Sequence, residues 1–275
     1  MLITLVDGVP DAGVPADDRG LAYGDGVFRT MAMRGGRVCR WPRHYAKLAS
    51  DCAALGIRPP AAEVLLGDIQ AVAARAADCS LRITVTRGGG GRGYALPEKP
   101  RHRRIVCADR LPDYPAEWAT RGITARWCRL QLAEQPAHAG IKHLNRLENV
   151  LARAEWDDPA IAEGLLQDAA GNVIEGTRCN VFLVEGGALV TPDLSRCGVA
   201  GVTRELVLES AEHHGLRCSV ETVSRRRLES ADEVLLVNSL IGVWPVAALG
   251  PRQWRDFPVA ALVRKWLDAF DHPAV

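Results

Sequence analysis

The stretch Ala139–Asn145 (AGIKHLN) places a lysine between a glycine-bearing loop and the start of an amphipathic run. The neighbours of Lys142 are mostly small or apolar, and the chain has only four lysines among its 34 lysine and arginine residues. A lysine that loses solvent can act as a nucleophile or a general base, whereas a guanidinium stays charged. The segment therefore predicts a reactive amine in a cleft, with a solvated surface lysine as the plain alternative.

Helix and strand patterns surround this stretch. Residues 42–56 carry apolar residues at helical spacing, and residues 81–86 alternate apolar and polar side chains as a strand does. A second stripe on the first helix carries His44, Lys47 and Asp51. A further helix after Lys142 is predicted from Leu144, Leu147, Leu151 and Ala154. Because strands and helices do not alternate strictly, the pattern favours an α+β fold.

The length of 275 residues is that of about two domains at roughly 150 residues each. Two prolines and mixed charge mark residues 111–121 as a linker. We therefore expect a smaller N-terminal α+β domain at 1–110 and a larger C-terminal α+β domain at 122–275, with Lys142 in the second.

Composition excludes several classes of protein. A hydrophobic content of 48% and a net charge of +1 indicate a globular protein without the basic surface that binds nucleic acid. The longest uncharged stretch, 234–251, is broken by glycines and a proline, so we expect no membrane span. Asp7 interrupts the N-terminal apolar run, which argues against a signal peptide. The eight cysteines are scattered without metal-ligand spacing, which predicts reduced thiols, no metal site and a cytoplasmic protein.

The glycine cluster at 88–93 follows a predicted strand and formally matches the GxGxxG pattern of dinucleotide-binding loops. That pattern requires a helix to begin there, but Pro97 and Pro100 follow instead. Two interpretations remain. The cluster is either a flexible loop or a loop whose backbone and two arginines, Arg87 and Arg92, approach an anionic ligand.

Three features beyond Lys142 complete a possible cofactor site. Glu175 follows an apolar strand and is either a turn residue or the partner of a buried cation such as a pyridinium nitrogen. The segment 201–203 begins a helix whose amides suit a phosphate, although Thr203 also fits a helix cap. Ser239 follows the strand at 233–238 and adds a hydroxyl. An amine, a carboxylate and a phosphate-binding group are what pyridoxal phosphate requires.

Three motifs occur in order along the chain: Asp18–Phe28 (DRGLAYGDGVF), Glu175–Phe182 (EGTRCNVF) and Gly198–Arg204 (GVAGVTR). Together they resemble the fold-type IV pyridoxal-phosphate enzymes, the group of branched-chain and D-amino-acid aminotransferases, and the resemblance extends over almost the whole chain. Two segments, Arg87–Tyr94 (RGGGGRGY) and Ala139–Glu148 (AGIKHLNRLE), resemble the aminodeoxychorismate lyases within that group. An aminotransferase usually carries a tyrosine shortly after the cofactor lysine, and here no tyrosine follows.

The resemblance implies a role for each matching residue. Lys142 would hold pyridoxal 5'-phosphate as a Schiff base and act as the catalytic base, and Glu175 would keep the pyridine nitrogen protonated. Lys47 stands where the family pattern H-x-x-R has an arginine, so it would offer the phosphate a charge without the bidentate fork. The remaining phosphate ligands would be Val202, Thr203 and Ser239.

The resemblance also implies a reaction. The chain would be a lyase that converts 4-amino-4-deoxychorismate to 4-aminobenzoate and pyruvate, and the two carboxylates of that substrate would need cationic partners. Thr30 would face the substrate and assist catalysis, next to Arg29 where the family often has Glu or Thr. The expected substrate-binding residues are Arg87, Arg92, Tyr94 and Arg146.

Two other functions stay open. An aminotransferase acting on D- or branched-chain amino acids would share the cofactor site but would require a keto-acid acceptor. A non-enzymatic binding protein would have kept only the fold. The resemblance further implies a homodimer with active sites near the subunit interface, while no nucleic-acid or membrane partner is expected.

Overall fold

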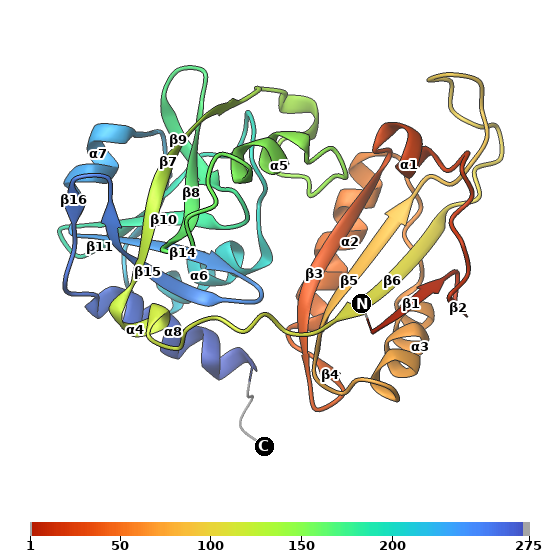
Figure 1. Cartoon of the computed structure of the whole chain (residues 1–275), viewed down its shortest axis with the longest axis horizontal. Coiled ribbons are helices and arrows are strands. Elements are labelled where there is room, and N and C mark those ends of the chain that lie inside the picture. Colours follow the sequence, from red (N-terminus) through yellow and green to blue (C-terminus); the bar gives the residue numbers. More distant parts are fainter. Residues whose placement is uncertain (1, 272–275) are drawn as a thin grey trace. The chain divides into compact units, whose positions relative to one another are not determined.

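The computed structural model describes residues 2–271, and it divides the chain into two compact units. The first unit holds residues 1–112 together with Ile141–Asn145, and the second holds Asp113–Gly140 and the chain from Arg146 onward. Both contain helices packed on sheets, which confirms the predicted α+β class (Figure 1). The two units are described separately below.

The first unit is a six-stranded antiparallel sheet with the strand order β2-β1-β6-β5-β3-β4. Helices α2 and α3 cover one face of it, and α1 precedes β3 in the chain (Figure 1). The strands are β1 (Ile3–Val6), β2 (Val9–Pro10), β3 (Gly26–Arg34), β4 (Arg37–Val38), β5 (Cys79–Thr86) and β6 (Arg103–Asp109). The helices are α1 (Arg19–Tyr23), α2 (Trp41–Ala54) and α3 (Ala62–Ala73).

Local sequence explains these elements. On β5, Leu81, Ile83 and Val85 are buried under the helices and alternate with more exposed polar residues, as the period-two pattern predicts. Helix α2 has a proline in its first turn, where the missing N–H costs nothing. It ends before Gly56, which adopts a left-handed φ of 63° that few other residues tolerate.

The segment Ile141–Asn145, called the lysine segment below, extends the sheet of the first unit beyond the expected domain boundary. The Phe28 N–H donates to the Lys142 carbonyl at 3.0 Å, and the Leu144 N–H donates to the Gly26 carbonyl at 2.9 Å. Ile141 adds its side chain to the core of that unit. The expectation that Lys142 belongs to the C-terminal domain is therefore corrected: because its backbone pairs with β3, the segment 141–145 packs with the first unit although the chain on both sides belongs to the second.

The second unit is built on a ten-stranded mixed sheet with the strand order β12-β11-β10-β14-β15-β7-β8-β9-β13 and β16 paired to β15. Strand β9 pairs with both β8 and β10, so the sheet closes on itself there. The strands are β7 (Ile123–Leu132), β8 (Ile161–Asp168), β9 (Asn172–Gly176), β10 (Asn180–Glu185), β11 (Ala188–Pro192), β12 (Cys218–Glu221), β13 (Val223–Ser224), β14 (Glu233–Asn238), β15 (Gly242–Leu249) and β16 (Arg252–Gln253).

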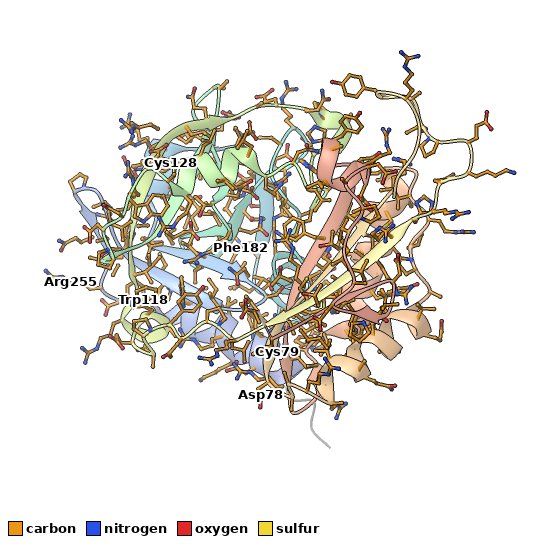
Figure 2. The ribbon with its side chains drawn as sticks, turned by 45° about the vertical axis from the view of Figure 1, so that its right-hand side comes forward. Asp78, Cys79, Trp118, Cys128, Phe182 and Arg255 are labelled. Carbon is orange, nitrogen blue, oxygen red and sulfur yellow. The ribbon has the colours of Figure 1, made fainter. Side chains whose placement is uncertain are left out.

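Helices cover this sheet on more than one side. Helices α6 and α8 pack against one apolar cluster that contains the fully buried Phe182, labelled in Figure 2. Helix α5 packs against another cluster that includes Cys128 and Trp156. The helices of this unit are α4 (Trp118–Arg121), the 3-10 turn η1 (Pro136–His138), α5 (Leu147–Arg153), α6 (Val202–His213), α7 (Arg225–Ser230) and α8 (Pro258–Asp271).

The expected linker at 111–121 is largely part of the second unit. The rings of Tyr114 and Trp118 pack edge-on against Trp244 of β15, with centroids 4.8 and 5.0 Å away. Helix α5 also begins later than the apolar pattern predicts, because residues 141–145 are extended against β3. Leu147 and Leu151, two of the residues from which the helix was predicted, are 67% and 52% exposed.

The eight cysteines are free thiols. Among the described residues no cluster of His, Cys, Asp or Glu could hold a metal ion. In the same part of the chain no helix is long and apolar enough to cross a membrane.

Candidate active site

Lys142 lies opposite Phe28 in the short ladder between the lysine segment and β3. Cross-strand partners present their side chains on the same face of a sheet. The Lys142 Nζ accordingly lies 4.7 Å from the centre of the Phe28 ring. The guanidinium carbon of Arg82 lies 4.0 Å from the same ring centre. Phe28 thus offers the lysine an apolar surface with a favourable cation–π contact.

Thr30 follows Phe28 by two residues on β3 and so lies on the same face of the sheet. It pairs with Arg82 of β5 and is half-buried. Arg29, between them, is 3% exposed and points to the opposite face, where its Nη2 contacts the Asp51 carboxylate of α2. The β3 strand therefore gives Thr30 and Arg29 different surroundings.

Asp51 is a buried carboxylate that the sequence marked only as part of a helical stripe. It is 1% exposed, and its Oδ1 lies 2.6 Å from the Lys47 Nζ one turn earlier on α2. Its Oδ2 accepts the backbone N–H of Lys142 at 3.1 Å. Lys47, predicted to bind a phosphate, is thus salt-bridged to the same carboxylate that accepts the Lys142 N–H.

His44 lies on the same stripe of α2 as Lys47 and Asp51. It is 2% exposed, and burial together with the charges of Arg29 and Arg40 lowers its pKa to about 3. The imidazole is therefore neutral at physiological pH. His44 therefore adds no charge to its neighbours. Arg29 and Lys47 are cations and Asp51 is an anion, so the formal charge of the group is one positive charge.

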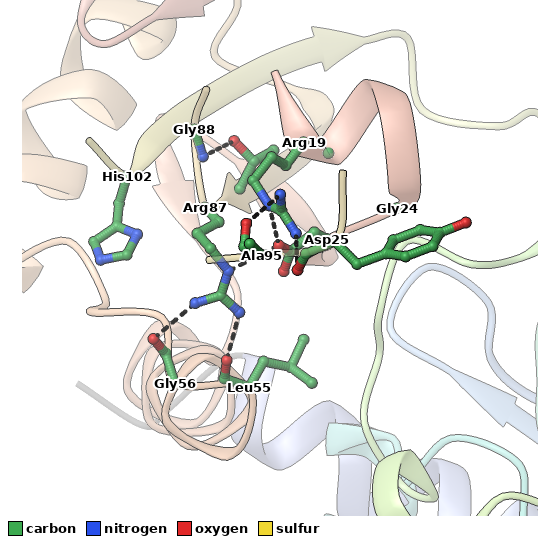
Figure 3. A network of polar contacts seen from close by, with 12 residues as sticks. Arg19, Gly24, Asp25, Leu55, Gly56, Arg87, Gly88, Ala95 and His102 are labelled. Atoms are coloured by element: carbon green, nitrogen blue, oxygen red, sulfur yellow. Dashed lines mark hydrogen bonds and ion pairs between the residues drawn. The ribbon is translucent and has the colours of Figure 1, made fainter. Parts of the chain in front are cut away.

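Arg19, Asp25 and Arg87 form a network at the base of the glycine loop (Figure 3). The Nε atoms of Arg19 and Arg87 both lie 2.8 Å from the Asp25 Oδ2. Burial raises the pKa of the Asp25 carboxyl, but the hydrogen bonds and charges of Arg87 and Arg19 outweigh it, so the pKa lies below its usual value. Asp25 is therefore an ionised anchor at neutral pH.

The two arginines connect this anchor to different parts of the unit. Arg87 donates to the carbonyls of Leu55 and Gly56, just beyond the end of α2, at 2.7 and 3.0 Å. The Arg19 guanidinium donates to three carbonyls of the glycine loop, at 3.1, 3.1 and 3.4 Å; they belong to Gly93, Ala95 and Tyr94. Arg87, predicted to bind substrate, has three of its nitrogen atoms engaged by the protein.

Arg92 and Tyr94 lie in the exposed part of the same loop. Tyr94 is 85% exposed, and its ring centre is 5.3 Å from that of Tyr23. Four glycines of the loop, at 88, 90, 91 and 93, have left-handed φ angles between 60° and 101°. The loop conformation therefore depends on its glycines and on the hydrogen bonds from Arg19 to the loop carbonyls.

In the second unit, Glu175 lies at the junction of β9 and β10. It is 4% exposed, and its Oε2 accepts the Val199 N–H at 2.8 Å. Gly198, the residue before Val199, has a left-handed φ of 85°, and a Cβ there would lie 2.7 Å from the Ile174 side chain. The chain can therefore pass this close to Glu175 because residue 198 is a glycine. The carboxylate is thus buried and fixed by a backbone donor, a placement that suits the partner of a buried cation.

Helix α6 begins in a cradle formed by Asn180. The Asn180 amide donates to the Val199 carbonyl at 2.7 Å, and its Oδ1 accepts the Gly201 N–H at 3.1 Å. A Cβ on Gly201 would lie only 2.4 Å from that oxygen, so a larger residue would displace the Asn180 side chain. Gly201 is the N-cap and provides no side-chain cap for the amides of Val202 and Thr203.

Two hydroxyls complete this helix start. The Thr203 Oγ1 lies 3.5 Å from the Ser239 Oγ at the end of β14. Uncapped first-turn amides and adjacent hydroxyls form an anion site at the positive end of the helix dipole. Together with Glu175 in the same unit, this donor set fits the phosphate and the protonated ring nitrogen of pyridoxal phosphate.

Arg146 immediately precedes α5 and is half-buried. Burial lowers the pKa of its guanidinium, while the charges of Glu175 and Glu148 act in the opposite direction. It is thus a cation in the electrostatic field of the predicted cofactor carboxylate, in the same unit.

A family model described as amino-transferase class IV matches residues 26–249, most of the chain. The chain belongs to the class IV aminotransferase family. The family depends on pyridoxal phosphate, and the cofactor and the fold-type IV architecture predicted from the sequence are thereby confirmed.

Two relatives carry the same enzyme name. Aminodeoxychorismate lyase of Vibrio harveyi is 34% identical over 261 residues, which cover 94% of this chain and 96% of that protein. The crystal structure of 4-amino-4-deoxychorismate lyase from Pseudomonas aeruginosa is 45% identical with a TM-score of 0.92, over 96% of this chain and 97% of that one. A putative branched-chain-amino-acid aminotransferase of Methanocaldococcus jannaschii is 30% identical over 94% of this chain and 91% of that protein.

The first prediction concerns Asn180. Asn180→Ala removes both hydrogen bonds that hold the chain before α6, each worth about 1 kcal/mol, and should weaken pyridoxal phosphate binding about tenfold. Asn180→Asp should weaken it further, because a negative charge would face the phosphate. Titration of the cofactor into apoprotein, followed by absorbance, measures both. Asn172→Ala on β9, whose amide bonds to Asp168, is the matched control, and equal loss in that variant would contradict the assignment.

The second prediction concerns Asp25. Asp25→Asn mimics the protonated carboxyl and should loosen the glycine loop, so that trypsin cleaves after Arg92 several-fold faster at neutral pH. Because the native pKa is lowered, the stabilisation is present above the usual carboxyl pKa and is lost as the pH falls through the lowered value. Asp7→Asn, which removes the partner of a more exposed arginine, is the control. A loop equally protected in Asp25→Asn would refute the anchoring role.

Proposed function

We propose that this protein is a pyridoxal-phosphate-dependent lyase that converts 4-amino-4-deoxychorismate to 4-aminobenzoate and pyruvate. The observation that carries the proposal is the likeness, over nearly the full length of both chains, to lyases of that name. The segment Ala139–Glu148 supports it from within the sequence, because no tyrosine follows the lysine.

When bound, pyridoxal phosphate supplies an electron sink for the carbon that bears the substrate amine. The residues of this chain do the rest. The Lys142 amine removes the ring hydrogen from that carbon, and the Glu175 carboxylate holds a proton on the pyridine nitrogen. The amides of Val202 and Thr203, with the Ser239 hydroxyl, bind the phosphate, and Lys47 contributes a positive charge.

The substrate's two carboxylates require cations. We assign Arg92 and Arg146 to them, with Tyr94 as a hydroxyl donor and Thr30 facing the reacting ring. Arg87 contributes by holding the loop, since its guanidinium is engaged by Asp25 and by the carbonyls beyond α2. Loss of the enolpyruvyl group with proton donation then makes the ring aromatic, which drives the reaction forward.

The alternative is an aminotransferase. It is favoured by the 30% identity to the Methanocaldococcus protein and by 25% identity to D-alanine aminotransferases of Staphylococcus epidermidis. Both reactions use the same cofactor residues, so only the acceptor distinguishes them. A lyase releases pyruvate without a keto acid, whereas a transaminase requires one. A non-enzymatic binding protein would carry out neither reaction.

The third prediction is the lyase test. Purified protein loaded with pyridoxal phosphate should form 4-aminobenzoate and pyruvate in equal amounts from aminodeoxychorismate without any keto acid. Fluorescence measures the first product and coupled reduction of pyruvate the second. No 4-aminobenzoate, with turnover of D-alanine and 2-oxoglutarate, would instead establish the aminotransferase.

Site variants sharpen this experiment. Lys142→Ala should lose at least about a thousandfold in turnover, because general-base catalysis alone contributes roughly 10²- to 10⁴-fold, and should lose the visible absorbance of covalently bound cofactor. Lys265→Ala removes an exposed lysine of α8 and should change neither. Covalent attachment that persists in Lys142→Ala would disprove the assignment of this lysine.

We propose a homodimer as the working form. In support, Leu147, Val150 and Leu151 form one apolar stripe on α5 and are 67%, 61% and 52% exposed. Three large apolar side chains at i, i+3 and i+4 are costly to leave in water and typical of an interface. A second copy of this chain is the occupant that the family resemblance implies.

The fourth prediction tests that stripe. Leu151→Glu should shift the protein from dimer to monomer in sedimentation velocity. Val64→Glu, on an exposed apolar position of α3, should leave the dimer intact. A monomeric wild-type protein at micromolar concentration would overturn the proposal.

We also propose a cytoplasmic enzyme whose partner is a small molecule, without nucleic-acid or membrane partners. Free thiols and a net charge of +1 support this proposal.

A further inference from the structure

Asp51 occupies a position in the first unit that the proposed chemistry does not use. Its carboxylate meets three donors from three segments of the chain: the Arg29 guanidinium of β3, the Lys47 ammonium of α2 and the backbone N–H of Lys142. We propose that Asp51 is the positioning residue for Lys142, fixing the peptide from which the reactive amine projects. This inference rests on the proposed role of Lys142 in cofactor binding.

The backbone geometry explains why such a residue is needed. The lysine segment contributes only a short ladder to β3, through the Lys142 carbonyl and the Leu144 N–H. The Lys142 N–H donates to Asp51 at 3.1 Å, so the carboxylate forms the next link of the segment. A hydrogen bond to a charged acceptor is stronger than a neutral one. The peptide on either side of the reactive side chain is therefore held by a different partner.

The surroundings make the carboxylate rigid. Asp51 is 1% exposed, and Arg29 and Lys47, its two cations, are themselves 3% and 15% exposed. Buried charges that are mutually paired have few alternative arrangements, because any movement leaves a charge without compensation. His44 on the same helix is neutral, so it adds no third positive charge to this group. Because Asp51 is held by Arg29 of β3 and Lys47 of α2, the Lys142 N–H that it accepts is held in a fixed position relative to both elements.

Charge placement gives Asp51 a second effect on the same site. It pairs with Lys47 on one oxygen, so the ammonium predicted to serve the phosphate is held one helical turn from its anchor. Removal of the carboxylate would free Lys47 to move and leave Arg29 without this buried partner. A variant at Asp51 should therefore disturb both Lys47 and Lys142. A variant at Lys47 should leave the Lys142 peptide in place.

The test compares variants by hydrogen–deuterium exchange of the apoprotein and by titration with pyridoxal phosphate. Asp51→Asn keeps the volume but leaves one oxygen for three donors. We expect exchange in peptides covering 141–145 to rise about tenfold, and the cofactor to bind about tenfold more weakly. The core strands β5 and β6 should keep their protection. Asp68→Asn, a buried carboxylate of α3 paired with Arg104, should leave exchange at 141–145 and cofactor affinity unchanged.

A double variant separates positioning from stability. Lys47→Met with Asp51→Asn removes one cation along with the carboxylate, so the midpoint of urea unfolding should recover towards that of the wild type. Exchange at 141–145 should stay fast, because the Lys142 N–H still lacks its charged acceptor. Unchanged exchange at 141–145 in a folded Asp51→Asn protein, or an increase spread evenly over the first unit, overturns the proposal. Both measurements need no aminodeoxychorismate, so a failed lyase assay would refute only the substrate assignment.

Discussion

Two backbone hydrogen bonds between β3 and residues 141–145 determine where the Lys142 side chain, the proposed reactive amine, lies. They set a register in which Lys142 faces Phe28, and Ile141 enters the core of the first unit. Because a strand alternates its faces, a shift of one residue would turn the lysine towards the helices and bury its charge. The chain leaves the second unit at Gly140 and returns to it at Arg146, so this register is set by a segment of only five residues.

Two carboxylates, the buried Asp51 and the partly buried Asp25, organise cations of the first unit. Asp51 gathers Arg29 and Lys47, Asp25 gathers Arg19 and Arg87, and each carboxylate also orders a backbone segment that is predicted to be functional. Such pairs contribute little net stability, since desolvation offsets attraction. We infer that their value is specificity, because the paired charges hold the glycine loop and the lysine peptide in one arrangement.

Much of the fold was predictable because it follows from local patterns. The alternation at 81–86 and the apolar spacing at 42–56 correspond to β5 and α2. The pairing of residues 141–145 with β3 was not predictable, because it joins positions more than a hundred residues apart and has no periodic signal of its own. The same limit affected the site. Residue type marked Lys142 and Glu175 as candidates, and these remain predictions. The partners of Arg87 and Asp51 emerge only from the tertiary structure.

The contrast between arginine and lysine follows from these partners. Arg19 and Arg87 each bind several acceptors at once, which requires the fixed fork of a guanidinium. The role proposed for Lys142 needs an amine, because a guanidinium stays protonated and cannot take that role. Lys47 is an intermediate case. Its ammonium contacts one oxygen of the Asp51 carboxylate, whereas a guanidinium could contact both oxygens. Arg29 contacts one oxygen of Asp51 and Lys47 the other, so a two-nitrogen contact from position 47 would meet the oxygen that Arg29 already engages.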